Sequence, residues 1–251
     1  MENFGDALKA QIELSGINQS QLARKCGYSS SQISALVKGV RLPKRGAVEA
    51  MDEALGAQGL LLRRWADAKR REAQPEWMRR ITDVEDQATE IRISQPTILP
   101  IVLQSEDYAR GILRLGRPLS SDQEIEAEIE RRTVRAKHLL RDGGPKITVM
   151  LPEHVVRAAP EIAPDALRYV QGLTESVLVQ VLPAGVHLAA SLGAFRLISF
   201  EDRLSVVFVE HAAGGGIVDH PATVSHFSAA ANLLQAEALR PVDSWNLIKE
   251  I

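Results

Sequence analysis

The chain changes its hydrophobic periodicity once, about 73 residues from its start. Up to that point apolar residues recur at the three- and four-residue spacing of helices, and no stretch alternates as a strand would. Further along, helical stretches are interspersed with short alternating or continuously apolar runs. The 251 residues are therefore expected to form two domains, a helical one over residues 1–73 and an α+β one over residues 76–251. The linker between them is expected near residues 72–75.

Five helices are expected in the first domain. Asn18 can cap the second helix and Ser29 the third, because their side-chain oxygens accept hydrogen bonds from free backbone N–H groups. Gly27 ends the second helix, and the third is expected over residues 30–37. The core of this domain should contain Phe4, Leu8, Leu22, Ile33, Leu36 and Val48.

Two short helices joined by a glycine-containing turn are typical of a helix-turn-helix, whose second helix enters the major groove of DNA. The charge pattern favours the same function. Residues 1–73 hold twelve Lys and Arg against eight Asp and Glu, whereas the rest of the chain holds 18 against 24. Between Leu14 and Val48 there is no acid, so this segment can approach phosphates without repulsion. Its six cations are Arg24, Lys25, Lys38, Arg41, Lys44 and Arg45.

The segment NQSQLARKCGYSSSQISALVKGVRLP, residues 18–43, resembles the helix-turn-helix of the XRE and lambda-repressor-like regulators. The resemblance implies a lambda-repressor-like five-helix bundle in which Gln19 holds a phosphate and braces the third helix. Gln32 is the first candidate for reading a base, because an amide can pair with adenine through two hydrogen bonds. Many relatives carry arginine where this chain has Ser30 and Ser31, so guanine readout is not expected from that turn. The candidate DNA-binding residues are Gln19, Ser29, Ser30, Ser31, Gln32, Ser34, Lys38, Arg41, Lys44 and Arg45.

Several of these residues have a plainer interpretation. Serine and glutamine on a helix can form an ordinary solvated surface, and the run at residues 69–71 can be a solvated helix end rather than a DNA contact. Cys26 stands where relatives carry an apolar residue and is expected to be a small buried hydrophobe rather than a redox switch. One cysteine allows neither an internal disulfide nor a cysteine-based zinc site.

The second domain is expected to contain helices packed on a small, mostly antiparallel sheet. Gly214, Gly215 and Gly216 are expected to form a flexible turn. Predicted helices cover residues 76–93, 106–115, 164–173, 221–238 and 242–249, together with a long helix that Ser120 caps and Gly143 ends. Predicted strands cover residues 146–151, 177–182, 194–200 and 205–209, the last two forming a hairpin.

Motifs of the second part resemble the C-terminal domain of a large actinobacterial group of XRE-type regulators described as antitoxin-like. Members are often encoded beside a very small protein, so the resemblance implies a possible partner of that kind. Relatives read PGLLQT where this chain has residues 100–105, PIVLQS, so the loop conformation is not carried over. The motifs are Glu85 to Ala88, LQSEDYARGIL, Arg131 with Arg135, VMLPEHVVR, VLVQVLPAGVH, GAFRLISF and VVFVE.

Three charged residues of this part, Arg131, Glu153 and Glu210, match positions where the resembling group carries the same type. One interpretation is an internal ion pair that joins a helix to the sheet. The other is a regulatory pocket for a signal molecule or for the tail of a partner. The sequence leaves both open.

No motif predicts catalysis, a cofactor or a metal. The histidines are scattered, and only His211, His220 and His226, with Glu210, come near a ligand set, so zinc would require the fold to bring them together. The serines lack the G-x-S-x-G frame of a hydrolase, and the glycine run lacks a phosphate-binding pattern. An enzyme stays an alternative that would need a pocket lined by several ionisable groups.

Taken together, these patterns predict a transcription regulator that binds double-stranded DNA in a sequence-specific manner. A homodimer is expected, because one helical module buries only about 600–1,000 Å² on DNA and binds weakly. The chain shows neither a signal-peptide pattern at its start nor about 18 consecutive apolar residues, so we expect a cytoplasmic, nucleoid-associated protein without a membrane partner. The alternative function is an antitoxin-like interaction protein that mainly sequesters a small protein encoded nearby.

Overall fold

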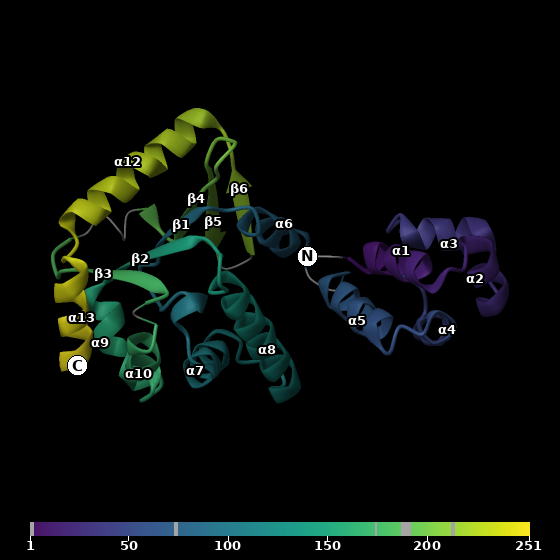
Figure 1. The fold of residues 1–251 in the computed structure, drawn as a ribbon. Helices are drawn as coiled ribbons and strands as arrows, with labels where there is room; N and C mark the ends of the chain where they lie inside the picture. Colours follow the sequence, from purple (N-terminus) through teal and green to yellow (C-terminus); the bar gives the residue numbers. More distant parts are fainter. Residues whose placement is uncertain (1–2, 73–74, 174, 187–191, 212–213) are drawn as a thin grey trace. The chain divides into compact units, whose positions relative to one another are not determined.

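The computed structural model describes the chain apart from residues 1–2, 73–74, 174, 187–191 and 212–213. The chain forms two compact units, Met1–Arg79 and Arg80–Ile251 (Figure 1). The division falls inside helix α6 (Glu76–Glu85), downstream of the linker expected near residues 72–75. Of that linker, Ala73 and Gln74 lie outside the described residues.

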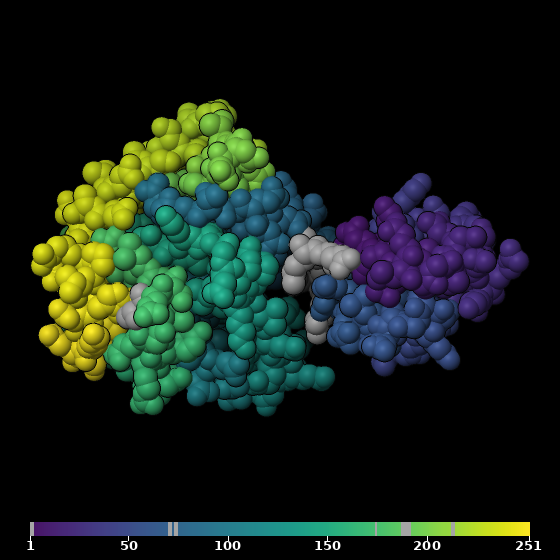
Figure 2. Space-filling view, in the orientation of Figure 1, coloured from purple at the N-terminus to yellow at the C-terminus, as the bar shows by residue number. Residues whose placement is uncertain are grey.

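The helices α1–α5 correspond one to one to the five helices predicted for the first domain, and they enclose one apolar core. In the space-filling view the purple segment of the first helices lies against the blue segment that follows (Figure 2). The predicted core residues Phe4, Leu8, Leu22, Ile33, Leu36 and Val48 are all buried. The helices are α1 (Phe4–Ser15), α2 (Gln19–Cys26), α3 (Ser30–Val37), α4 (Arg45–Leu55) and α5 (Leu60–Glu72).

Gly5, in the first turn of α1, sets how closely this helix approaches the end of α3. A Cβ atom at Gly5 would lie 2.5 Å from the carbonyl oxygen of Val37 and 3.0 Å from that of Leu36. Both neighbours are backbone atoms and cannot rotate away. Only glycine therefore lets α1 pack against the C-terminal end of α3 at this distance.

We expect Gly5→Ala to lower the free energy of unfolding of the first unit by about 1–3 kcal/mol, because the added methyl group forces the two helices apart. Gly46→Ala is the matched control, since Gly46 lies in α4 and a Cβ atom there meets nothing within 4 Å. Urea unfolding followed by circular dichroism measures both variants. Equal stability of the two variants would contradict the close approach of α1 and α3.

The second unit is built on one mixed sheet with the strand order β3-β2-β1-β4-β5-β6. Among the described strands, β1 pairs with β2, and β2 with β3, in parallel, whereas the other three pairings are antiparallel. This confirms an α+β domain with mainly antiparallel pairing and the predicted hairpin of β4 and β5. The strands are β1 (Glu90–Ser94), β2 (Lys146–Pro152), β3 (Val177–Leu182), β4 (Phe195–Ser199), β5 (Val206–His211) and β6 (Gly214–Val218).

Helices cover both faces of this sheet (Figure 1). Helix α12 packs on one face through Ala231 and Leu234, which meet Met150, Phe195 and Leu197 of the sheet. The other face lies against α7 to α10, and α13 packs beside the edge strand β3. Besides α6, the helices are η1 (Ile101–Leu103), α7 (Glu106–Gly116), α8 (Asp122–Leu139), α9 (Glu153–Ile162), α10 (Ala166–Gln171), α12 (Pro221–Glu237) and α13 (Pro241–Glu250).

The prediction of one helix over residues 76–93 is wrong. The helix ends at Glu85, and residues from Glu90 onward form β1 at the centre of the sheet. Ile91 and Ile93 alternate with more polar residues and are 1% and 4% exposed. The prediction was wrong because the helical spacing of residues 76–85 was continued through this short alternation. Hydrogen bonds to β2 and β4, which the local spacing does not show, stabilise a strand there instead.

The glycine run at 214–216 was also assigned wrongly, because it lies in β6 rather than in a flexible turn. A Cβ atom at Gly215 would lie 2.1 Å from Cζ of Phe208, so a glycine is needed to pack against this ring. Two smaller differences concern helices. The long helix α8 is capped by Ser121 instead of Ser120, and α9 was not predicted.

Candidate nucleic-acid interface

Helices α2 and α3 are joined by a turn that depends on a glycine. Gly27 has φ of 68°, in the left-handed region that side chains disfavour, and it is followed directly by Tyr28 and the capping residue Ser29. Leu22 on α2 and Ile33 on α3 are fully buried against the same core. The turn and the core thus hold α3 in place, with the face opposite to Ile33 toward solvent.

The solvent face of α3 is built from short hydroxyl side chains. Ser30 and Ser31 are exposed, and Ser34 is half-buried one turn later. The Ser30 hydroxyl donates to Oγ of Ser20 on α2 at 3.0 Å, and the hydroxyls of Ser29 and Ser31 lie 2.9 Å apart. These bonds orient the hydroxyl groups before any partner arrives.

Gln32 also has a structural role, which was not predicted. Its Oε1 accepts a hydrogen bond from the backbone N–H of Ser29 at 2.8 Å, while its own backbone N–H donates to Oγ of Ser29 at 3.2 Å. This is a capping box, which stabilises the start of α3. A contact with adenine through two hydrogen bonds uses the amide oxygen as acceptor and Nε2 as donor. Oε1 of Gln32 would then have to accept from adenine and from the Ser29 N–H at the same time.

The same arrangement occurs at the start of α2, where Gln21 rather than Gln19 completes the cap. Oε1 of Gln21 accepts from the backbone N–H of Asn18 at 2.8 Å, and Asn18 Oδ1 accepts in return from the N–H of Gln21 at 2.9 Å. Gln19 is the first residue of α2 and is half-buried. Its side chain is therefore not required for the cap.

Exposed cations follow α3 in the acid-free segment. Lys38 ends α3, Arg41 lies in the loop that follows, and Lys44 precedes α4; all three are exposed. Among the six cations of the segment, all of which the structure describes, Arg45 forms an ion pair, with Glu49 at 3.0 Å. The positive charge of the loop is thus available to an outside partner.

Trp65 fixes the end of this basic loop. Its indole Nε1–H on α5 donates to the carbonyl oxygen of Pro43 at 2.8 Å, and Pro43 is buried. Trp65 was not predicted as part of the interface, because a tryptophan on an amphipathic helix indicates only that the helix packs on a core. On the same helix Lys69 pairs with Glu72 at 2.6 Å, whereas the side chains of residues 70–71 lie outside the described part.

Cys26 is half-buried beside the core of the first unit. Burial raises the pKa of its thiol, although the nearby Lys25 opposes this shift. A raised pKa disfavours the reactive thiolate. This environment agrees with a packing role.

The three charged residues singled out in the second unit lie apart from one another. Each has a different partner among the described residues: Arg131 pairs with Glu128 at 2.5 Å, Glu153 with Arg157 at 2.7 Å, and Glu210 with Arg196 at 3.3 Å. Glu210 lines a small cavity of about 30 Å³ that neither Arg131 nor Glu153 reaches.

A buried charge network does join the helices to the sheet, and of the three residues singled out only Glu210, among the described contacts, takes part in it. Glu85, at the end of α6, receives Arg135 of α8 at 2.8 Å and Arg196 of β4 at 2.7 Å. Its side chain is 2% exposed. Arg196 extends the network to Glu210 and lies over the Phe208 ring, 5.5 Å from its centroid. Burial lowers the pKa of Arg135, while the Glu85 carboxylate opposes this shift.

Residues 78–250 match the family model described as a domain of unknown function, DUF5753. The chain belongs to the DUF5753 family. Residues 3–65 match a second model, described as a helix-turn-helix domain, which supports a DNA-binding regulator. No curated protein and no solved structure matches the chain.

The DUF5753 domain thus includes the whole sheet and the buried charge network. Its described residues contain no group of three or more His, Cys, Asp or Glu placed to hold a metal ion. His211 ends β5, His220 precedes α12 and His226 lies within it, while His138 pairs with Asp86. Across the described chain, the helices are too short or too polar to span a membrane.

Proposed function

We propose that this DUF5753 protein is a transcription regulator of the XRE, lambda-repressor-like kind, which reads double-stranded DNA with α3. The observation that carries the proposal is the exposed face of α3, which continues into the basic loop of residues 38–45. A helix-turn-helix places its second helix in the major groove. Lys38, Arg41 and Lys44, which form no ion pair among the described residues, can then bind the flanking phosphates.

The proposed contacts are of two kinds. Lys38, Arg41 and Lys44, with Gln19, bind phosphates and position the protein, whereas the side chains on the front of α3 contact base edges. Ser30, Ser31 and Ser34 offer short donors and acceptors, and Gln32 can donate from Nε2 without giving up its cap. No arginine lies in the first turn of α3, so the expected operator is not read there through guanine.

The DUF5753 domain is proposed to carry dimerisation and response to a signal, without catalysis. Residues 74–251 hold 18 cations against 24 acids, a charge that opposes contact with DNA. A two-fold dimer would supply the second helix-turn-helix for a palindromic site. The resemblance to antitoxin-like regulators makes a small protein a second candidate partner, and the site of action is proposed to be the nucleoid.

Gln32→Glu tests the base-reading part of this proposal. Glutamate keeps the oxygen that caps α3 but removes the Nε2–H donor, so we expect a loss of about 1–3 kcal/mol on the selected operator and a smaller loss on random DNA. Fluorescence anisotropy with labelled duplexes measures both. Binding that weakens equally on operator and random DNA would remove Gln32 from the reading set.

The matched control for the added charge is Gln21→Glu. Gln21 holds the same position in the capping box of α2, so the substitution adds the same charge and keeps the same kind of cap. We expect this variant to weaken operator and random DNA alike. Circular dichroism of both variants checks that the helices are retained.

A further inference from the structure

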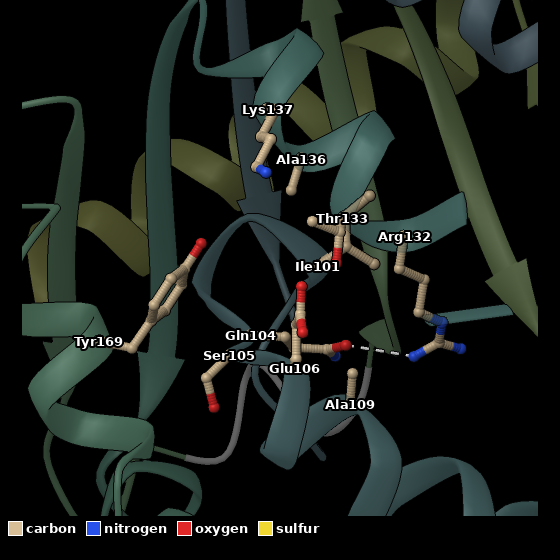
Figure 3. A pocket seen from close by; sticks show the side chains of 10 residues that line it. All are labelled: Ile101, Gln104, Ser105, Glu106, Ala109, Arg132, Thr133, Ala136, Lys137 and Tyr169. Atoms are coloured by element: carbon tan, nitrogen blue, oxygen red, sulfur yellow. Dashed lines mark hydrogen bonds between the residues drawn. The ribbon is translucent and has the colours of Figure 1, made fainter. Parts of the chain in front are cut away.

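The DUF5753 domain contains a solvent-accessible cavity of about 120 Å³ between η1, α7, α8 and α10. Ile101, Ala109 and Ala136 supply apolar surface, and Thr133 adds a hydroxyl group (Figure 3). These residues come from segments that are distant in the sequence. The cavity therefore exists only because η1, α7, α8 and α10 pack together.

Two opposite charges face this cavity from different helices. Figure 3 shows the Lys137 side chain extending from α8 toward it, and the Glu106 carboxylate extending from the first turn of α7. Both residues are described, and no ion pair joins them to each other or to a third residue there. Two such groups beside one cavity can each still pair with a charge on a bound molecule.

The neighbouring arginine is already occupied. Arg132 Nε donates to the Glu128 carboxylate at 3.2 Å, and its Nη1 donates to Oε1 of Gln104 at 3.2 Å. Gln104 in turn donates from Nε2 to the carbonyl oxygen of Leu99 at 2.6 Å. Arg132 and Gln104 are thus held in place by these bonds, and among the described residues that line the cavity Lys137 is the cation without an ion pair.

Tyr169 of α10 completes the polar lining. Figure 3 shows its ring standing at one side with the hydroxyl group toward the cavity. Burial raises the pKa of Tyr169, and the negative charge of Glu106 raises it further. The hydroxyl is therefore protonated at neutral pH and can donate a hydrogen bond to an anionic group.

We propose that this cavity binds a small zwitterion of the α-amino acid class. Lys137 and the Tyr169 hydroxyl bind the carboxylate, Glu106 binds the ammonium group, and the surface of Ile101, Ala109 and Ala136 takes a short apolar side chain. An enclosed apolar cavity of roughly 150 Å³ holds benzene, which has six non-hydrogen atoms. The space of about 120 Å³ here is smaller, so it suits a short apolar side chain, while the charged groups of the ligand stay at the solvent-exposed side chains of Lys137 and Glu106.

Such a ligand joins α7, α8 and α10, which otherwise meet at the cavity without a charge contact between Lys137 and Glu106. Binding of the amino acid to the DUF5753 domain does not depend on the proposed function. Its role as an effector that changes DNA affinity does rest on that function. The two are tested by separate measurements.

The binding test uses isothermal titration calorimetry of the full chain with L-valine at up to about 10 mM. Two analogues each lack one charge: 3-methylbutanoate lacks the ammonium group and isobutylamine lacks the carboxylate. We expect saturable binding of valine and at least about tenfold weaker binding of each analogue, because each loses a charge-assisted hydrogen bond. Glycine, alanine, serine and threonine are titrated in the same way.

Variants assign the site. Lys137→Met and Glu106→Gln are each expected to weaken valine binding at least about tenfold. Lys146→Met and Glu130→Gln are the matched controls, because both residues are exposed and do not line the cavity, and we expect them to bind as the native chain does. Thermal unfolding of all four variants confirms that they are folded.

The proposal is overturned if none of the five amino acids binds saturably, if an analogue lacking one charge binds as tightly as its parent, or if both cavity variants keep native affinity. DNA binding is measured separately by anisotropy with and without valine. A chain that binds valine but no DNA would contradict the proposed function and leave the amino acid site standing. A chain that binds DNA but no amino acid would contradict the amino acid site and leave the proposed function standing.

Discussion

Replacing Glu85 with leucine is expected to lower the free energy of unfolding of the DUF5753 domain by about 3–5 kcal/mol. The carboxylate is buried between Arg135 and Arg196, and its loss leaves two guanidinium groups without their main partner. The Glu210 carboxylate forms its ion pair with Arg196, at 3.3 Å, and acts on Arg135 only through a longer-range attraction, so it does not replace the two hydrogen-bonded contacts of Glu85. Urea unfolding of the full chain, followed by circular dichroism, measures the change.

The control for this experiment is Glu126→Leu. Glu126 forms an ion pair with Arg110 at 2.8 Å, but its side chain is 54% exposed and its charge is screened by water, so we expect a much smaller loss of stability than for Glu85. Comparing the two variants separates the effect of removing a buried carboxylate from that of removing an exposed one. A Glu85 variant as stable as the Glu126 variant would show that the network does not hold α6 and α8 to the sheet.

The double charge reversal Arg41→Glu and Lys44→Glu is expected to weaken binding to every DNA sequence by about 100-fold or more at low salt. Each cation that binds a phosphate releases counterions, so the slope of log affinity against log salt should fall by about two. Anisotropy titrations over a range of salt concentrations measure both quantities. Circular dichroism verifies the fold.

Lys9→Glu with Arg63→Glu is the matched control. It changes the net charge by the same amount, within the same unit, at exposed residues outside the acid-free segment. We expect this control to lose clearly less DNA affinity, and the slope of its log affinity against log salt to stay nearly unchanged. If both double variants weakened binding equally, the loop of residues 38–45 would not be the phosphate-binding surface.

Local signals in the sequence were sufficient for the first unit. Asn18 and Ser29 cap their helices through atoms three residues away, and Gly27 ends α2 by its own backbone conformation, so no distant partner is needed. The role of Gln32 in the cap was missed although its spacing from Ser29 is that of a capping box. The base-reading residues stay predictions.

In the second unit, several features depend on contacts between distant residues and could not be predicted from the sequence. Strand β1 depends on its neighbours β2 and β4, which lie far away in the chain. Its alternating residues were therefore predicted as the end of a helix. Glu85 and Arg135 were recognised as parts of separate motifs, but nothing in the sequence says that they meet each other and Arg196. The cavity near Lys137 likewise requires three packed helices, which no single pattern reveals.

Selection from a random double-stranded DNA library with the native full chain tests whether α3 reads a DNA sequence. A Ser30→Ala, Ser31→Ala, Ser34→Ala triple variant, which alters the front of α3 and leaves the basic loop intact, is selected in parallel. We expect the native chain to enrich a defined motif, and the variant to lose this motif or change it while still binding DNA. Failure of the native chain to enrich any sequence, or enrichment of an identical motif by the variant, would contradict sequence reading by α3.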